Sequence, residues 1–122
     1  RELYGKGFTG NYGDGAQRRD YIYIDDAIDV MMLPLEKNMK EQIAIINAGG
    51  GKQYSLKNLV DIVLRLTKSK SKVLFGAFPD RFLEADEWLL DNTKAKELLS
   101  WEPETSLEQG LKKMIDYYKN RC

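Results

Sequence analysis

The sequence predicts an α/β fold. Segments rich in β-branched and aromatic residues alternate along it with segments whose apolar residues recur at helical spacing. The chain has 122 residues, of which 43% are hydrophobic. That length and composition fit one packed domain and rule out two full ones. We therefore expect a single domain with short strands and three to four helices.

The first part of the chain predicts turns, a strand and a helix. Five glycines lie between residues 5 and 15, which is typical of turns. The aromatic and β-branched run Arg19–Ile24 predicts a short strand. We expect Asp25 and Asp26 to end this strand and to cap a buried helix over residues 27–37, which its proline kinks or ends.

The middle of the chain repeats this alternation. Ile43–Asn47 is a continuous apolar run, which suits a buried strand, and three glycines follow it. Ser55 is then expected to cap a helix whose apolar residues, between 56 and 66, have helical spacing. Lys72–Phe75 predicts a second short strand, and residues 76–90 are expected to be irregular.

Two more helices are expected near the C-terminus. Asp91 or Asn92 is predicted to cap a short helix that ends at Leu99. Ser106 and Gln109 have the spacing of a capping box and predict the start of the last helix, which runs to about residue 119.

Charge and composition exclude several function classes. The chain has 19 basic and 19 acidic residues, so a net charge of zero argues against a partner that is nucleic acid or a membrane surface. It has no histidine, which excludes histidine-based triads and removes the commonest general base. Its single cysteine forms neither an intrachain disulfide nor a zinc site, so we expect a cytoplasmic protein. The chain starts at Arg1 and not at Met, and we interpret it as a piece of a longer protein.

The glycine-rich motifs and the tyrosines do not predict a cofactor loop or a catalytic pair. Gly10–Gly15 has the wrong spacing for a dinucleotide fingerprint, and a strand, not a helix, is expected after it. Ala48–Lys52 lacks the Ser or Thr of a phosphate-binding loop. No tyrosine has a lysine four residues further on. Ordinary turns explain both glycine-rich segments better.

Two arginines remain as candidates for binding an anion. Arg19 lies between the glycine-rich turns and the first strand, and Arg81 lies in the irregular segment. A guanidinium donates two parallel hydrogen bonds to phosphate and keeps its charge. On composition alone, an exposed or salt-bridged arginine is the better interpretation of each.

Several segments together resemble one enzyme family. They are, in chain order, Gly13–Asp26 (GDGAQRRDYIYIDD), Ile46–Gly49 (INAG), Ser55–Leu59 (SLKNL), Asp91–Pro103 (DNTKAKELLSWEP) and Ser106–Leu111 (SLEQGL). The first resembles the G-D-G-x-Q-x-R-D-F-x-Y-V-x-D segment of NAD(P)-dependent sugar-nucleotide epimerases and dehydratases, the extended short-chain dehydrogenases. The resemblance runs from about residue 9 to residue 118 in the right order and spacing.

This resemblance implies the C-terminal, substrate-binding portion of such an enzyme. The N-terminal Rossmann half, with its NAD(P) loop and its Tyr/Lys catalytic pair, has no counterpart in the chain. Residues 1–122 would form a single sugar-nucleotide-binding portion, of which about 20–37 would pack on the missing Rossmann domain. The missing half would cover apolar helix faces, so self-association of this chain is expected.

The resemblance also assigns site residues. Arg19 and Arg81 would bind the diphosphate of a nucleoside-diphosphate sugar, because each aligns with a phosphate-binding arginine of the family. Glu84 would accept hydrogen bonds from the ribose hydroxyls, and Tyr12 would contact the base. A carboxylate suits a vicinal diol because it only accepts hydrogen bonds. No catalytic, cofactor-binding or metal-binding residue is expected in the chain. Ser100 replaces the family's usual glycine before a tryptophan, which is expected to loosen that helix end.

The implied function is that of the sugar-nucleotide-binding part of an NAD(P)-dependent epimerase or dehydratase. NAD or NADP would serve the full-length enzyme, whereas the chain alone would bind neither and would be inactive. Two alternatives stay open: a non-catalytic module that binds sugar nucleotides, and a structural or oligomerisation module. The nucleotide base, the sugar, the choice of NAD or NADP and the reaction subtype are open as well.

Overall fold

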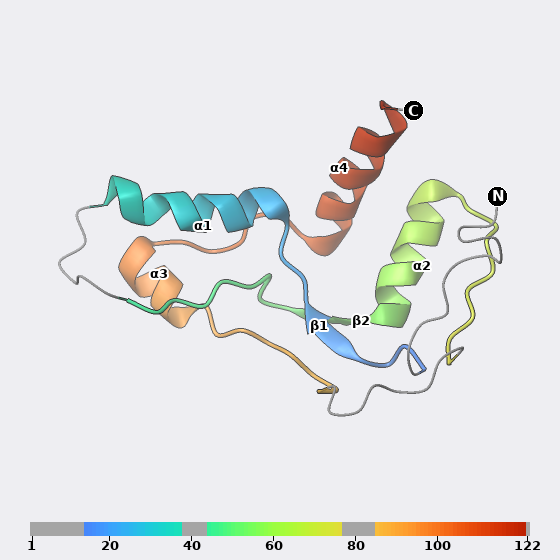
Figure 1. Cartoon of the computed structure of the whole chain (residues 1–122), viewed down its shortest axis with the longest axis horizontal. Helices are drawn as coiled ribbons and strands as arrows, with labels where there is room; N and C mark the ends of the chain where they lie inside the picture. Colours follow the sequence, from blue (N-terminus) through green and yellow to red (C-terminus); the bar gives the residue numbers. More distant parts are fainter. Residues whose placement is uncertain (1–13, 38–43, 77–84, 122) are drawn as a thin grey trace. The chain divides into compact units, whose positions relative to one another are not determined.

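The computed structural model of the protein describes residues 14–37, 44–76 and 85–121. These residues form four helices and two short strands in the order β1, α1, β2, α2, α3, α4 (Figure 1), which confirms the α/β class. The chain divides into two compact units. Unit 1 comprises residues 1–19 and 54–88, and unit 2 comprises residues 20–53 and 89–122.

The strands β1 (Arg18–Asp20) and β2 (Gln53–Ser55) form a two-stranded sheet. In unit 1, the Leu56 amide donates to the Gln17 carbonyl at 3.1 Å, and the Lys57 amide donates to the Gly15 carbonyl at 3.1 Å. The partner's number falls as the chain advances, so the two segments run in opposite directions. This sheet places the start of the next helix beside the end of the glycine-rich segment.

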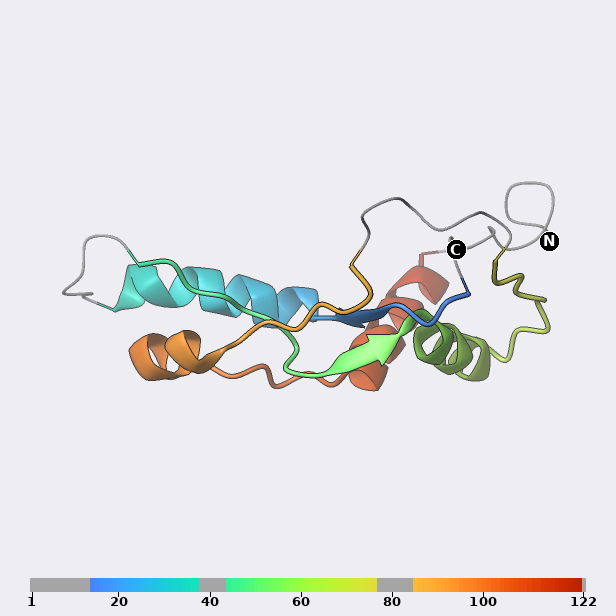
Figure 2. The same cartoon turned by 90° about the horizontal axis from the view of Figure 1, so that it is seen from below.

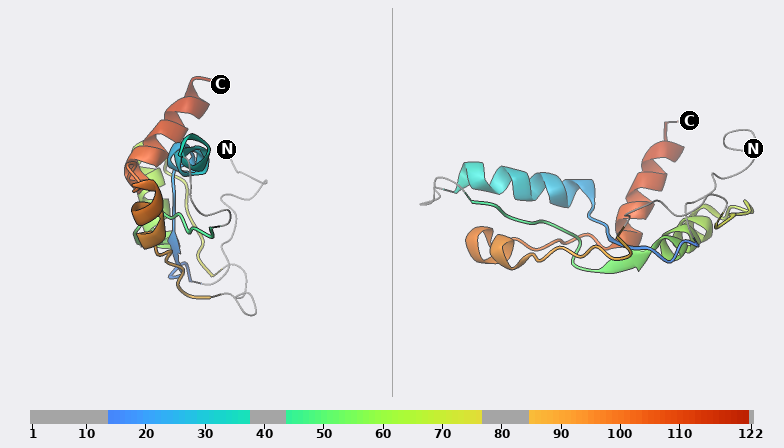
Figure 3. Two further views of the ribbon diagram at one scale, coloured as in Figure 1. Left: turned by 90° about the vertical axis from the view of Figure 1, so that its left-hand side faces the viewer. Right: turned by 60° about the horizontal axis from the view of Figure 1, so that its bottom comes forward.

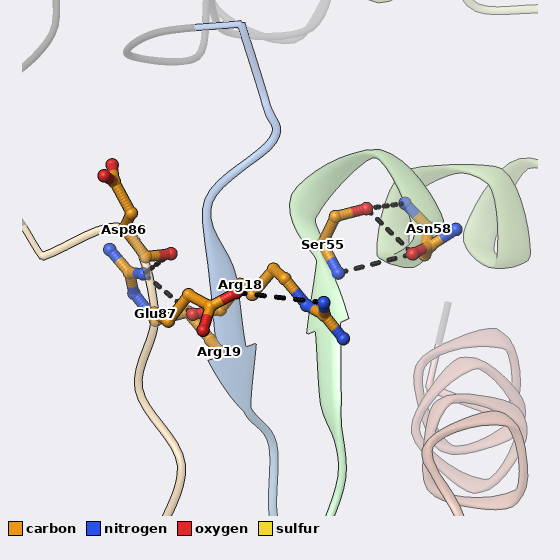
Figure 4. A network of polar contacts seen from close by, with 6 residues as sticks. All are labelled: Arg18, Arg19, Ser55, Asn58, Asp86 and Glu87. Carbon is orange, nitrogen blue, oxygen red and sulfur yellow. Dashed lines mark hydrogen bonds and ion pairs between the residues drawn. The ribbon is translucent and has the colours of Figure 1, made fainter.

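Helix α2 (Leu56–Thr67) begins where the sequence predicts. Ser55 is its N-cap, and the Asn58 amide donates to the Ser55 hydroxyl at 3.1 Å (Figure 4). The Asn58 side chain in turn accepts from the Ser55 amide, which completes a capping box. The helix ends at Thr67, and its C-cap, Lys68, has a left-handed φ of 54°.

Unit 2 is built on helices α1 (Ile24–Glu36) and α3 (Thr93–Leu99), which lie side by side in Figures 1 and 2. The left view of Figure 3 looks along the axis of α1 and shows α3 beside it. Their core is formed by four buried residues, Val30, Ala95, Leu99 and Trp101. The contact of α1 with α3 therefore joins residues about 65 positions apart, which sequence spacing alone does not predict.

The boundary between β1 and α1 differs from the prediction. The strand ends at Asp20, and the helix begins at Ile24 with Tyr23 as its N-cap. Asp25 and Asp26 are therefore not caps: they lie in the first turn, where carboxylates favour the positive end of the helix dipole. The helix also continues two residues past Pro34.

The prediction that α1 is buried is wrong for most of its surface in this chain. Only Asp26 and Val30 are buried, and five large apolar residues are exposed: Ile24, Ile28, Met31, Met32 and Leu35. The helix is apolar on most sides, but its main neighbour among the described elements, α3, covers one face only. A helix with apolar residues all round needs partners on several sides to bury them.

Neither of the strands predicted at Ile43–Asn47 and Lys72–Phe75 forms among the described residues, and Ile43 itself lies outside them. Ile45 is 82% exposed, so that run is not buried either. An apolar run becomes a strand only when a neighbouring strand pairs with it. The pairing that does form involves β2, which the sequence did not predict.

The C-terminal helices agree with their predicted ends. Helix α4 (Leu107–Lys119) begins with a capping box in which the Gln109 amide donates to the Ser106 hydroxyl at 3.3 Å. Helix α3 ends at Leu99 as predicted, and Asn92 is its N-cap, although no side-chain bond caps it. In the part of the chain that the structure describes, no helix is long and apolar enough to cross a membrane.

Candidate functional site

Arg19 is the one predicted site residue that the structure describes. It lies on β1 in unit 1. Tyr12, Arg81 and Glu84 lie outside the described residues. The roles predicted for all four residues stay predictions. The structure describes the surroundings of Arg19 alone among them.

The guanidinium of Arg19 is held by backbone carbonyls. Its Nη1 donates to the Arg18 carbonyl oxygen at 2.9 Å and to the Asp86 carbonyl oxygen at 3.3 Å (Figure 4). The second bond joins residues 67 positions apart. Two acceptors on one nitrogen restrict the long side chain, so less rotational freedom is lost when it binds a ligand.

Residues 86–88 lie along β1 as a short parallel partner. The Arg18 amide donates to the Asp86 carbonyl at 2.7 Å, and the Trp88 amide donates to the Arg18 carbonyl at 3.1 Å. Figure 4 shows this segment on one side of β1 and the start of α2 on the other. Arg81 and Glu84 precede this segment by a few residues in the sequence.

An ion pair lies beside this bridge. Arg18 Nη1 is 3.8 Å from Glu87 Oε1, and both side chains are more than half exposed.

Unit 1 as a whole contains ten basic and seven acidic residues, whereas unit 2 contains nine basic and twelve acidic residues. The zero net charge therefore conceals a positive excess in the unit that carries Arg19, which favours an anionic ligand there.

The glycine-rich segment supports the same unit through packing. Gly15 has a φ of 78°, and a Cβ at this position would overlap the ring of Phe75. Lys57 lies over that ring at 5.7 Å from its centroid, and its Nζ is 3.8 Å from Asp14 Oδ2. Glycine is therefore required at position 15, because its φ is left-handed and because the Phe75 ring leaves no room for a Cβ.

The second glycine run is held by contacts within unit 2. The Gly49 amide donates to Asn92 Oδ1 at 2.8 Å, and Asn92 Nδ2 donates to the Gly49 carbonyl at 2.9 Å. A Cβ at Gly50 would overlap the carbonyl oxygen of Tyr21. The amide and the carbonyl of Gly49 are therefore both paired with Asn92 within unit 2. Among the described residues there is also no group of three or more His, Cys, Asp or Glu that could hold a metal ion.

A broad depression in unit 2 has a volume of about 830 Å³, and Arg19 is not among the described residues that line it. On its wall, Lys96 Nζ forms a 2.8 Å ion pair with Glu102. Asp91 accepts hydrogen bonds from the Thr93 hydroxyl at 2.6 Å and from the Thr93 amide at 2.9 Å. These bonds hold the pKa of Asp91 below its ordinary value, the hydroxyl contributing most. The polar groups on this wall are thus largely paired with one another.

The residues that sequence reasoning missed are Arg18, Asp86 and Glu87. Arg18 is adjacent to Arg19, and its charge gave no sign of a separate role. The Asp86 group that matters is a backbone carbonyl, which no residue pattern reveals. The pairing of Arg18 with Glu87 depends on a parallel bridge that neither strand prediction contained.

Comparison with protein families gives one family model, described as GDP-mannose 4,6 dehydratase, which matches residues 3–114. Among relatives, the chain is 39% identical over 109 residues to a UDP-glucuronate 4-epimerase of Thermodesulfobacterium geofontis. That match covers 88% of this chain and 32% of the relative.

Solved structures give the same result. A UDP-glucose 4-epimerase of Thermotoga maritima with UDP-glucose matches with a TM-score of 0.82 and 33% identity, over 97% of this chain and 36% of that one. A UDP-glucuronic acid 4-epimerase of Bacillus cereus, in complex with UDP-glucuronic acid and NAD, matches with a TM-score of 0.85 and 29% identity. It is covered to 37%, and this chain to 98%. The chain thus spans about a third of the length of the relatives it matches.

Proposed function

Because the chain belongs to the GDP-mannose 4,6 dehydratase family, we propose that it is the C-terminal, sugar-nucleotide-binding portion of an NAD(P)-dependent epimerase or dehydratase. It binds the diphosphate of a nucleoside-diphosphate sugar through Arg19. The solved relatives named above are complexes with UDP-sugars, which makes UDP the first ligand to test.

The observation that carries this proposal is the anchoring of Arg19. Its guanidinium is fixed by the carbonyls of Arg18 and Asp86, in the unit with the positive excess of charge. A planar cation held in place suits a diphosphate, because the fork donates parallel hydrogen bonds and stays charged. Arg81 would supply a second cation, Glu84 would accept from the ribose, and Tyr12 would contact the base.

The test is a titration with UDP followed by the amide chemical shifts of the chain in NMR spectra, which measures weak affinities. Arg19→Ala should weaken UDP binding about ten- to a hundredfold, since a charge-assisted hydrogen bond contributes about 1.5–3 kcal/mol. Arg19→Lys should recover part of the loss, because the charge returns without the fork. Equal binding by Arg19→Ala would contradict the assignment.

A matched control is Arg121→Ala. Arg121 lies in unit 2 with its guanidinium over the Tyr117 ring, 4.6 Å from the centroid, so it is also a held arginine. Its removal should leave UDP affinity unchanged. Titrations with dTDP, CDP and GDP in parallel would establish the base preference.

Catalysis is proposed to need parts of the enzyme beyond this chain. The sequence contains no Tyr-x-x-x-Lys pair and no histidine, and the Gly49 amide is already paired with the Asn92 side chain. NAD or NADP, bound elsewhere in the enzyme, would supply hydride transfer at the sugar. We expect no turnover of a UDP-sugar by the purified chain with NAD or NADP added. Detectable turnover would overturn this part of the proposal.

The exposed side of α1 supports a further part of the proposal, that about residues 20–37 pack against the nucleotide-binding half of the enzyme. Ile24, Ile28, Met31 and Leu35 follow one another at helical spacing and are between 48% and 77% exposed. A stripe of this kind marks a contact surface. The encoding reading frame tests this: an upstream G-x-x-G-x-x-G and Tyr-x-x-x-Lys would supply the missing half, and their absence would contradict it.

A further inference from the structure

The parallel bridge between β1 and residues 86–88 is small. The Arg19 side chain binds both of the backbone carbonyls that take part in this bridge. The bridge consists of two backbone hydrogen bonds, from the Arg18 amide to Asp86 and from the Trp88 amide to Arg18. Arg19 Nη1 donates to the same two carbonyl oxygens, those of Asp86 and Arg18. The position of the guanidinium therefore follows the register of residues 86–88 on β1.

An ion pair between two side chains also spans the bridge. Arg18 Nη1 is 3.8 Å from Glu87 Oε1, and these two residues are the bridge partners themselves (Figure 4). A strand pair of this length is marginal on its own. Because this ion pair joins directly opposed residues, it is a comparatively large part of the interactions that hold residues 86–88 in register on β1.

We propose that Arg18 and Glu87 are positioning residues for Arg19: their ion pair keeps residues 86–88 in register on β1 and so holds the Arg19 guanidinium ready for a diphosphate. This inference rests on the proposed function of Arg19. Neither residue touches the ligand. Their effect passes through the shared carbonyls of Arg18 and Asp86.

A positioning role and a purely electrostatic role predict opposite results for the Glu87→Gln variant. If the two residues acted only through their charges, Glu87→Gln would tighten the binding of an anion, and Arg18→Gln would weaken it. If they position Arg19, both variants weaken binding. Both side chains are more than half exposed, so each loss should be about two- to fivefold.

The experiment is an NMR titration of the 122-residue chain with UDP and, separately, with uridine. Arg18→Gln and Glu87→Gln should each weaken UDP binding about two- to fivefold and leave uridine binding unchanged, because uridine has no phosphate. The charge-exchanged double variant, Arg18→Glu with Glu87→Arg, should restore UDP affinity. A matched control is Glu102→Gln, which breaks the Lys96–Glu102 ion pair of unit 2 and should leave UDP affinity unchanged.

Three outcomes would overturn the inference: tighter UDP binding by Glu87→Gln, unchanged UDP binding by both single variants, or equal losses of UDP and uridine. Arg19→Ala separates this failure from failure of the proposed function. If Arg19→Ala weakens UDP binding while the two variants do not, only the positioning role falls. If Arg19→Ala has no effect, or the wild-type chain binds no UDP, both fall together.

Discussion

Asp26 and Thr105, 79 positions apart, are joined by two hydrogen bonds in unit 2. The Thr105 amide donates to Asp26 Oδ2 at 2.9 Å, and the Thr105 hydroxyl donates to Asp26 Oδ1 at 3.0 Å. Asp26 is only 5% exposed. Thr105 directly precedes the N-cap of α4, so this contact fixes the start of α4 on the first turn of α1.

The Asp26→Ala variant should lower the free energy of unfolding by about 2–3 kcal/mol, because it removes bonds to a buried charged acceptor and leaves Thr105 donors unpaired. Urea-induced unfolding measures this. Asp25→Ala is the matched control. The Asp25 side chain is exposed in the same helical turn, so its removal should lower the free energy of unfolding by at most about 1 kcal/mol. Equal losses in the two variants would contradict the role given to Asp26.

Gly110 should resist a substitution that usually stabilises helices. Alanine is favoured over glycine in a helix interior by about 1 kcal/mol. At Gly110, however, a Cβ would lie 2.8 Å from Cδ2 of Tyr23. We expect Gly110→Ala to lower the unfolding free energy by about 1–3 kcal/mol, as overpacking does. In a Tyr23→Ala background the same change should stabilise the protein. A gain in the wild-type background would refute the packing argument.

Ser100→Gly should stabilise the end of α3. Ser100 has a φ of 55° and a ψ of 36°, a left-handed conformation that glycine adopts without the steric cost of a Cβ. We expect a gain of about 1 kcal/mol in thermal or urea unfolding. Ser100→Ala retains the Cβ and should give no gain. The left-handed Lys68 at the end of α2 offers a second case, and Lys68→Gly should act in the same direction.

Asp91 should titrate below its ordinary pKa, since the Thr93 hydroxyl and amide both donate to its carboxylate. A carboxyl with a lowered pKa in the folded state stabilises the fold above the unfolded pKa, and this contribution is lost as pH falls through the folded pKa. NMR titration of the carboxyl measures the value directly. In Thr93→Val the pKa should move back toward the ordinary one, and an unchanged value would rule out the hydroxyl as the main cause.

The exposed stripe on α1 should drive self-association of the isolated chain. Met31 and Leu35 are the most exposed residues of this stripe, at 72% and 77%. Light scattering at high protein concentration should report a mass above that of a monomer, and the double variant Met31→Glu with Leu35→Glu should reduce it. A strictly monomeric wild-type chain would contradict this expectation.

The sequence predicted features that depend on local chemistry and missed those that depend on distant partners. Ser55 and Ser106 were recognised as caps because each directly precedes a helical pattern, and a cap bonds a residue only a few positions further on. The start of α1 was misplaced, because Asp26 binds Thr105 and not its own helix. The exposure of Ile45 was missed because an apolar run indicates burial only when a partner is present.

The same division applies to the candidate site. Arg19 was selected through a family resemblance, since an arginine at the start of a strand is otherwise unremarkable in a sequence. What anchors it, the carbonyl of Asp86, is 67 positions away and belongs to the backbone. No residue type predicts such a contact, because every residue carries the same carbonyl group.

The order in which the chain builds its two units has a consequence for dissecting the protein. Residues 1–19 and 54–88 belong to unit 1, and residues 20–53 and 89–122 belong to unit 2, so the chain passes between the units three times. No single cut separates the two units from each other: every fragment made by one cleavage or one truncation lacks a part of at least one of them. Chimeras made with a single crossover inside this chain would therefore mix parental sequences within at least one unit, and exchanging a whole unit requires three junctions.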